Sequence, residues 1–352
     1  MLDFYKGKKI FLTGHTGFKG TWLCRILLAA GAEVTGYALK PPTVPSLFIQ
    51  TNTKKDIHSI TGDVRNRNAL IKAINDAKPD ILFHMAAQPI VRFSYREPAL
   101  TFETNVMGTV NILEAIRQTS SVISFVNITT DKVYENKEWP WGYRENENLC
   151  GFDPYSNSKS CSELITYSYR NSFFSVKKNM PAISTARSGN VIGGGDYTDD
   201  RIIPDCIRAV QAGEEIIVRN PSSTRPYQYI LDTLYGYLLI AQKQYNDKTL
   251  EGAYNFGPDD ENCVTTGKLA EMFCHAWGSG ATWRIQKDKG PHEANFLKLD
   301  CSKVKTVLEW KPKLNIETAI EKIVDFARSN TDNERLACVN RQITEYFLKN
   351  HV

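Results

Sequence analysis

The chain has 352 residues, of which 42% are hydrophobic and 23% charged, a composition typical of a soluble globular protein of about two domains. The 43 basic side chains exceed the 39 acidic ones by four, which is too weak a surplus to indicate a nucleic-acid partner but suits an anionic small molecule. No apolar run approaches the ~18 residues that span a bilayer, so a membrane protein is excluded and no membrane partner is expected.

Short strand-like runs alternate with helical segments through the first half of the chain. This alternation predicts an α/β fold, in which a Rossmann-type doubly wound parallel sheet carries helices on both faces. Such a sheet binds ligands outside the carboxyl ends of its strands. The expected strands cover residues 8–13, 33–38, 58–61, 81–84, 122–128 and 182–186, and the expected helices cover 18–31, 69–77, 99–119 and 154–174.

A glycine-rich turn, GHTGFKG, joins the first strand to the first helix. Its three glycines allow a tight turn and a close approach of the backbone to a pyrophosphate, whose charge is met by the helix N-terminus. In this strand-turn-helix context the pattern predicts a dinucleotide site. The candidate residues are Gly14, His15, Thr16, Gly17, Phe18, Lys19 and Gly20.

The ends of two later strands fit the same cofactor. Asp63 follows the third strand, where a carboxylate can accept a hydrogen bond from an adenine amino group, and Val64 is adjacent. Ala86 and Ala87 follow the fourth strand, where small side chains leave room for a cofactor. The second strand lacks the terminal Asp or Glu that binds the ribose of NAD, so the residues alone leave NAD and NADP open.

The fifth expected strand ends in the sequence TTDK, residues 129–132. The hydroxyl of Thr130 can orient a substrate alcohol. Asp131 is a carboxylate for which a simple dehydrogenation has no use, and a protonated Asp in a partly desolvated site can donate to a departing hydroxyl. The alternative is an Asp that only forms a turn.

Tyr155 and Lys159 lie four residues apart at the start of an expected helix, with Asp153 as N-cap and Pro154 in the first position. This spacing places both side chains on one helix face. A tyrosine acts as a base near neutrality only if its pKa falls, and we expect the ammonium, a nicotinamide cation and the helix N-terminus to lower it. The second YxxxK of the chain, Tyr5 with Lys9, precedes the first strand and is attributed to chance.

Beyond residue 188 the alternation loosens into connections rich in Gly, Pro and Arg. We therefore expect residues 1–187 to form the cofactor-binding domain, joined by about 227–257, which show another strand and helix. Residues 188–352 would form mainly a smaller C-terminal substrate-binding lobe. The tail from about residue 330 is expected to be a polar helix.

These motifs together resemble the extended short-chain dehydrogenase/reductase family that acts on nucleotide sugars. Within that family the chain is most similar to the CDP-glucose 4,6-dehydratase subgroup, and the resemblance is most specific in the first half. It rests on GHTGFKGTWL (14–23), AAQPIVRFSYREP (86–98), TTDKVYEN (129–136), WGYREN (141–146) and YSNSK (155–159).

The resemblance implies NAD as cofactor and a hexose linked to a nucleoside diphosphate, CDP-glucose or a similar sugar, as substrate. Implied cofactor contacts include Gln88, Asn105, Tyr155 and Lys159 besides the residues above. Implied substrate contacts are Arg92, Ser94, Asn190, Arg201, Arg225, His292 and Glu293.

The reaction that the resemblance implies is a dehydration in three steps. Tyr155, assisted by Thr130 and Lys159, would deprotonate the 4-hydroxyl while NAD⁺ oxidises C4. Asp131 would protonate the leaving O6 as water is lost across C5 and C6, and reduction at C6 would restore NAD⁺. Many related dehydratases have a Glu after this Asp as the C5 base, but here Lys132 follows, so Lys132, Tyr155 and water remain candidates.

Three other functions compete with this prediction. A nucleotide-sugar 4-epimerase shares the oxidation at C4 but gains nothing from Asp131. The substrate of a dehydratase could instead carry GDP or UDP. A non-catalytic NAD(H)-binding regulator would not need Thr130, Tyr155 and Lys159 together.

The distribution of cysteines and histidines predicts the cellular setting and the absence of a metal. The eight cysteines form no CxxC pair and the six histidines are not at metal-ligand spacing, so neither a disulfide framework nor a metal site is expected. The first residues do not resemble a signal peptide, which favours the cytoplasm. The resemblance alone implies a homodimer or a dimer of dimers, joined through the helices at 99–119 and 154–174.

Overall fold

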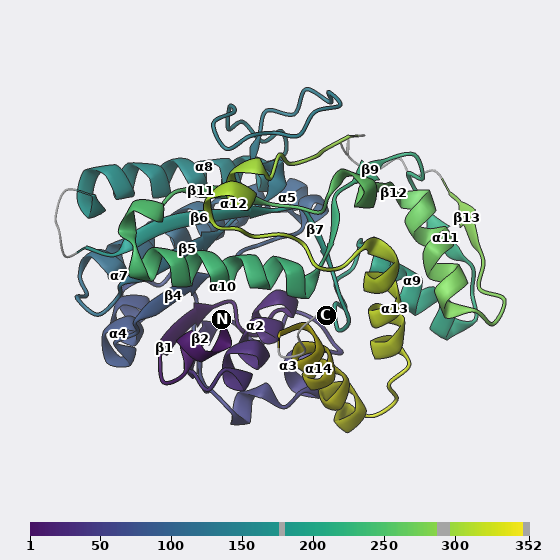
Figure 1. Cartoon of the computed structure of the whole chain (residues 1–352), viewed down its shortest axis with the longest axis horizontal. Coiled ribbons are helices and arrows are strands. Elements are labelled where there is room, and N and C mark those ends of the chain that lie inside the picture. The colour runs from purple at the N-terminus through teal and green to yellow at the C-terminus, as the bar shows by residue number, and fades with distance from the viewer. Residues whose placement is uncertain (176–179, 287–295, 348–352) are drawn as a thin grey trace.

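Figure 1 shows the computed structural model, which describes residues 1–175, 180–286 and 296–347. Its centre is a seven-stranded sheet in the order β11-β6-β5-β4-β1-β2-β3, and all adjacent strands run parallel. The predicted α/β fold with a Rossmann-type sheet is confirmed. The strands are β1 (Lys9–Thr13), β2 (Glu33–Ala38), β3 (His58–Thr61), β4 (Ile81–His84), β5 (Ser124–Ile128), β6 (Ala182–Ser188) and β11 (Ala253–Phe256).

Helices cover both faces of the sheet. Because side chains alternate along each strand, one strand contributes to the core on both faces. In β1, Ile10 and Leu12 join the core that includes residues of α2 and α10, whereas Phe11 joins the core that includes residues of α4 and α7. Helix α8 packs beside α7 on this second face. The helices are α1 (Leu2–Tyr5), α2 (Phe18–Ala29), α3 (Leu47–Gln50), α4 (Arg67–Ala77), α5 (Val91–Arg96), α6 (Pro98–Phe102), α7 (Gly108–Arg117), α8 (Pro154–Tyr169) and α10 (Ile230–Asn246).

After β6 the chain leaves the sheet and later returns to it. Helix α10 packs on β5 and β6, and β11 then pairs with β6 as an edge strand. Near the C-terminus, α14 (Asp332–Phe347) lies beside α2 and α3 (Figure 1). Helix α12 (Ser302–Val307) packs against β11. The smaller region contains β7 (Asn190–Ile192), α9 (Ile202–Ala212), β8 (Ile216–Val218), β9 (Thr224–Arg225), β10 (Tyr227–Tyr229), β12 (Val264–Thr265), α11 (Thr266–Trp277), β13 (Trp283–Ile285) and α13 (Ile316–Ala327).

The element boundaries follow the sequence pattern closely where the pattern is strong. Strands β2, β3 and β4 have the predicted limits, whereas α2 ends at Ala29, two residues before its predicted limit, and is followed by Gly31, with φ of +75°. The stretch expected as one helix over 99–119 is instead α6, a π-helical turn and α7. A second π-helical turn, Arg170–Phe174, extends α8. Hydrophobic periodicity cannot distinguish such turns from a continuous helix.

All eight cysteines lie within the described residues and are free thiols. Across the described ranges, no helix has both the length and the apolar character needed to cross a bilayer. Within the same residues, no three His, Cys, Asp or Glu side chains come together as a metal site would require.

Candidate active site

Two of the three glycines in the turn after β1 have no room for a side chain. Gly14 has φ of +79°, and a Cβ there would lie 2.8 Å from the backbone nitrogen of Ala86. A Cβ on Gly20 would lie 2.1 Å from the carbonyl oxygen of Gly14. Gly17 is the N-cap of α2, and no side chain of the described residues caps this helix by a hydrogen bond. The turn therefore offers backbone amides and a helix N-terminus to a phosphate.

Two polar side chains of this turn, His15 and Thr16, are buried and bind other parts of the protein. The Nε2 atom of His15 lies 2.8 Å from Ser59 Oγ, and burial lowers the pKa of His15 to about 4, so the ring is neutral at pH 7. Thr16 donates a hydrogen bond of 3.0 Å to the carbonyl oxygen of Leu39. These contacts connect the turn to β3 and to the end of β2.

The first two residues of α2, Phe18 and Lys19, face the smaller region. The ring of Phe18 lies 3.0 Å from the position of a Cβ on Gly193. Lys19 Nζ lies 3.5 Å from the hydroxyl of Tyr237. Burial and the positive charge of Arg201 lower the pKa of Lys19 to about 7.

The predicted cofactor residues after β3 and β4 lie at the carboxyl edge of the sheet, next to the glycine turn. Asp63 Oδ2 lies 2.6 Å from NH2 of Arg65, and this pairing holds the pKa of Asp63 below its usual value. Val64 is buried beside Gly108, whereas Ala86 and Ala87 are partly exposed.

Asn105 holds the loop after β4 against α8. Its Oδ1 accepts a hydrogen bond of 2.8 Å from the backbone nitrogen of Gln88, and its Nδ2 donates to Ser158 Oγ at 2.9 Å. The Asn105 amide is therefore bound within the protein, and it positions the segment that carries Gln88.

The start of α8 is capped as the sequence predicts. Asp153 accepts hydrogen bonds from the backbone nitrogen of Ser156 at 3.0 Å and from its hydroxyl at 2.5 Å. Pro154 occupies the first turn. The cap fixes the direction in which Tyr155 and Lys159 leave the helix.

Tyr155 is buried beside Thr130, to whose side chain its hydroxyl is hydrogen bonded. The backbone nitrogen of Tyr155 donates to Ser94 Oγ at 3.1 Å, so Ser94 lies beneath the tyrosine. In this chain burial raises the pKa of Tyr155 to about 12, although Thr130 and Arg201 act in the opposite direction. In the chain alone, desolvation of the phenolate sets this pKa, and its lowering by Lys159, the helix N-terminus and a nicotinamide cation together stays a prediction.

Lys159 lies one turn further into α8 and is buried. Its Nζ donates a hydrogen bond of 3.1 Å to the carbonyl oxygen of Ile128, the last residue of β5. Burial lowers the pKa of Lys159 to about 8, while the carboxylate of Glu163 raises it. The lysine thus joins α8 to the strand that ends in the TTDK segment.

Asp131 is a buried carboxyl group with one oxygen pointing away from its hydrogen-bonded neighbour. Oδ1 accepts from Thr130 Oγ1 at 3.0 Å, whereas Oδ2 has no hydrogen-bond partner among the described residues. Burial raises the pKa of Asp131, although Lys132 and Arg225 oppose this effect. A carboxyl group in this setting favours the protonated form and can donate a proton.

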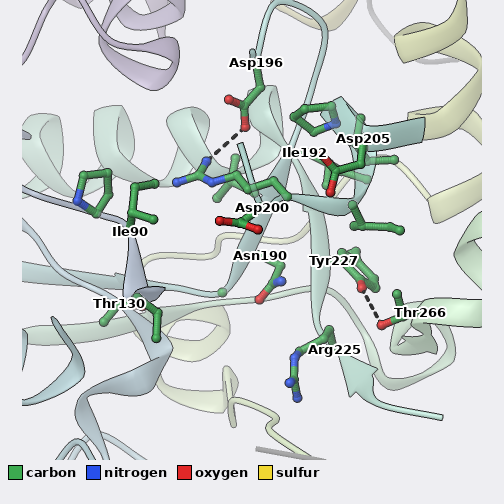
Figure 2. Close-up of a pocket in the computed structure, with 18 of the residues that line it drawn as sticks. Ile90, Thr130, Asn190, Ile192, Asp196, Asp200, Asp205, Arg225, Tyr227 and Thr266 are labelled. Carbon is green, nitrogen blue, oxygen red and sulfur yellow. Dashed lines mark hydrogen bonds and ion pairs between the residues drawn. The ribbon is translucent and has the colours of Figure 1, made fainter. Parts of the chain in front are cut away.

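These residues surround a cavity of about 370 Å³ between the sheet edge and the smaller region (Figure 2). Ser94 and Lys159 lie behind its wall and are not among its lining residues. Arg225 is largely buried on β9, and Asn190 begins β7, which pairs with β10. The predicted residues that line the cavity are Lys19, Arg92, Thr130, Asp131, Lys132, Tyr155, Asn190, Arg201 and Arg225.

The outer part of the cavity carries ion pairs. Arg201 NH1 lies 3.0 Å from Asp196 Oδ2, a pair that Figure 2 draws as a dashed line. Asp200 Oδ1 lies 2.7 Å from Arg219 NH1 and 3.8 Å from Arg92 Nε. Arginines of this kind can bind a diphosphate in place of a carboxylate.

The sequence analysis missed several residues that contribute to this site. Asp200 and Arg219 belong to connections without a recognisable motif, and only the fold brings them to the cavity. Glu163 has a usable signal, because it lies four residues after Lys159 on the same helix. The predicted substrate residues His292 and Glu293 lie outside the described residues.

The arrangement combines the parts of an oxidoreductive elimination. A glycine turn with room for a phosphate lies at the sheet edge, a tyrosine and a threonine are hydrogen bonded at the cavity wall, and a buried carboxyl group stands beside them. Such a set can move a proton from one hydroxyl and deliver a proton to another.

Comparison with known proteins gives consistent matches along the whole chain. The family model for GDP-mannose 4,6 dehydratase matches residues 11–323. A CDP-glucose 4,6-dehydratase of Salmonella typhimurium is 46% identical over 351 residues, covering 98% of each chain.

Solved structures support the fold. A UDP-glucose 4-epimerase of Thermus thermophilus in complex with NAD superposes with a TM-score of 0.79 at 24% identity, covering 92% of this chain and 99% of the other. A dTDP-glucose 4,6-dehydratase of Bacillus anthracis in complex with NAD superposes with a TM-score of 0.75 at 20% identity, covering 90% and 95%. At these identities the likeness establishes the architecture alone.

Proposed function

The chain belongs to the GDP-mannose 4,6-dehydratase family, and from that premise we propose that it is a hydro-lyase, a CDP-glucose 4,6-dehydratase. The product would be CDP-4-dehydro-6-deoxy-D-glucose, an intermediate for deoxysugar synthesis. The observation that carries the proposal is the buried carboxyl group of Asp131 beside Thr130 and Tyr155, since oxidation at C4 alone gives it no task.

The proposed cofactor is NAD, which the glycine turn fits, because Gly14 and Gly20 leave no space for a side chain where the backbone must approach a pyrophosphate. The turn would hold the pyrophosphate of the cofactor. The loops that carry Asp63, Ala86 and Gln88 would flank the remaining parts of the cofactor. The chemistry that NAD supplies when bound is hydride transfer, out of C4 and then into C6 of the sugar.

In the first half-reaction Tyr155 would take the proton of the 4-hydroxyl and Thr130 would orient that hydroxyl. Tyr155 on its own is a poor base at pH 7, because its pKa is about 12. Tyr155 would act as the base with its pKa lowered by the positive charge of a bound, oxidised nicotinamide. The positive charge of Lys159, one turn further along α8, would support Tyr155 in this role.

In the second half-reaction Asp131 would give its proton to the departing O6. Burial raises the pKa of this carboxyl group, which favours its protonated form, and Oδ2 would be the oxygen available to the sugar. The C5 proton needs a base, for which Lys132, Tyr155 and water are candidates. The variant Lys132→Met tests the first of these candidates. Retained exchange of the C5 proton in this variant would exclude Lys132 as the base.

The arginines of the outer cavity would bind the diphosphate of the substrate. Arg92, Arg201 and Arg225 have the charge for this role, and Asn190 could hydrogen bond to the sugar diphosphate. Binding would require Arg92 and Arg201 to exchange their carboxylate partners Asp200 and Asp196 for phosphate oxygens.

We further propose a homodimer or a dimer of dimers, joined by the helical stretch 98–117 and α8. Four apolar side chains of these helices and of the π-helical turn after α8 are exposed in the single chain. Their exposure supports an interface in which a second copy of the chain covers them. They are Met107, Leu164, Tyr167 and Phe173. Sedimentation of the wild type and of a Leu164→Glu/Tyr167→Glu variant tests this assembly. Two negative charges in the proposed interface should favour the monomer.

The function is tested by incubating the purified protein and NAD with CDP-, dTDP-, GDP- and UDP-glucose. We expect CDP-glucose to lose one water. When the substrate carries deuterium at C4, the label should appear in the C6 methyl group of the product. An unchanged mass with a new configuration at C4 would indicate an epimerase. A preference for another nucleotide would contradict the CDP assignment, and NAD binding without turnover would indicate a regulator.

A further inference from the structure

Helix α8 carries a third polar residue on the face of Tyr155 and Lys159. Glu163 lies one turn beyond Lys159 and only 3% of its side chain is exposed. Its Oε1 accepts a hydrogen bond of 2.5 Å from Thr129 Oγ1, and its Oε2 accepts one of 2.7 Å from Thr185 Oγ1. One carboxylate therefore joins α8, the end of β5 and strand β6.

The contact with Thr129 reaches the reacting groups through the backbone. Thr129 immediately precedes Thr130 and Asp131, and its own nitrogen donates to the carbonyl oxygen of Ala186 at 2.9 Å. Two anchors thus fix the residue from which both proposed catalytic side chains extend. A shift of this residue would move Thr130 and Asp131 together relative to Tyr155.

Arg187 balances the charge of Glu163. Its NH2 lies 2.8 Å from Glu163 Oε2, and its NH1 donates to the hydroxyl of Tyr134 at 2.7 Å. The Arg187 side chain is also 3% exposed. Because burying two charges costs about as much as their attraction returns, a buried ion pair alone adds little stability. Its position beside the reacting groups points to another role.

The titratable groups around Lys159 come from three elements. Glu163 and Tyr155 belong to α8, Lys19 extends from α2, and His84 lies on β4. His84 is neutral because burial and Lys159 lower its pKa to about 3. Within the described part of the chain, Glu163 is the carboxylate that favours the protonated form of Lys159.

We propose that Glu163 is a positioning residue of the dehydratase, which holds the Thr129–Asp131 segment in register with Tyr155 and places a negative charge one helical turn from Lys159. The proposal rests on the proposed function, since it takes Tyr155, Thr130, Asp131 and Lys159 as the reacting set. Glu163 itself touches neither substrate nor cofactor. It is separated from the cavity by Thr129, which lines the wall.

The first test is a titration of Lys159 in protein labelled with [ε-¹³C]lysine, with Lys159→Met used to assign its signal. We expect the Lys159 signal to titrate about one pH unit lower in Glu163→Gln than in the wild type. Glu163→Asp keeps the carboxylate and should restore most of the shift. This measurement needs no turnover, so it remains informative if the substrate assignment fails.

The second test is the pH profile of kcat with CDP-glucose. Activity that needs protonated Lys159 falls as pH rises through its pKa, so the alkaline limb should move to lower pH in Glu163→Gln. We expect kcat at the optimum to fall about tenfold with little change in KM, as for a misplaced reacting group. Glu114→Gln is the matched control, because Glu114 is a mostly buried carboxylate paired with Arg117 on α7 but does not line the cavity.

A variant that leaves Arg187 unpaired is expected to lose stability for that reason alone. The double variant Glu163→Gln/Arg187→Met removes both charges, so neither is left buried without its partner. It therefore separates loss of the Glu163 carboxylate from loss of stability. An unmoved Lys159 titration together with a wild-type kcat profile in this double variant would overturn the proposal. A wild type that does not release water from CDP-glucose would instead refute the proposed function, whatever the titration gives.

Discussion

The two walls of the cavity differ in how their polar groups are held. On the sheet side, Tyr155, Lys159 and Asp131 are almost inaccessible to water and are fixed by hydrogen bonds to backbone or to neighbouring side chains. On the side of the smaller region, the side chains of Arg219 and Asp200 are 31% and 38% exposed, and they are held by an ion pair. We call the first the dry wall, and the part of the second that carries Arg219 and Asp200 the wet wall.

The difference separates chemistry from binding. Burial shifts the pKa of Tyr155 upward and that of Lys159 downward, so small changes in nearby charge decide which groups carry protons. Exposed ion pairs contribute little energy and are screened by salt, so they can exchange a carboxylate for a phosphate at low cost. Substitutions on the two walls should therefore affect different kinetic constants.

The largest effect is expected from Tyr155→Phe, which removes the proposed base from the dry wall. We expect kcat to fall by about 10³-fold while the dissociation constant for CDP changes little. Tyr227→Phe is the matched control, because Tyr227 lines the opposite wall and its hydroxyl lies 3.0 Å from Thr266 Oγ1. Equal losses in the two variants would contradict a division of labour between the walls.

Asp131→Asn should produce the next largest loss. The amide has the shape of the acid but no proton of comparable acidity, so release of water should slow by about 10²-fold while oxidation at C4 persists. Because the pKa of Asp131 is raised, the wild-type rate of elimination should decline as pH rises through it. Rapid quench at several pH values measures both steps, and near wild-type elimination in the variant would exclude Asp131 as the acid.

Arg219→Ala tests the wet wall. Arg219 lines this wall beside Arg92 and can bind the diphosphate with it, so its loss should raise KM for CDP-glucose about tenfold and leave kcat nearly unchanged. Calorimetric titration with CDP should show weaker binding as ionic strength rises, and the variant should depend less on salt than the wild type. A fall in kcat at constant KM would mean that this wall also orients the reacting sugar.

The smallest effect is expected from Asp200→Asn. This substitution removes the carboxylate with which a diphosphate would compete for Arg219 and Arg92. CDP should therefore bind about two- to threefold more tightly, in keeping with the small energy of an exposed ion pair. Weaker binding in the same titration would show instead that Asp200 holds Arg219 in its binding position.

Sequence reasoning performed unequally on these two walls. The sheet-side residues follow strands and helices whose periodicity is strong, so their place at one edge followed from the doubly wound pattern. The charge state of Tyr155 did not follow, because burial depends on everything packed around the ring. Asp200 and Arg219 were missed altogether, since they lie in connections that carry no local motif.

The sequence alone determined the α/β sheet, the glycine turn after β1 and the pairing of Tyr155 with Lys159 on one helix face, because these depend on residues close together in the chain. Only the tertiary structure brought Glu163 to Thr129 and Arg187, and the smaller region to Asp131. Burial and electrostatic environment are sums over residues distant in sequence, so they appear only when the chain is folded.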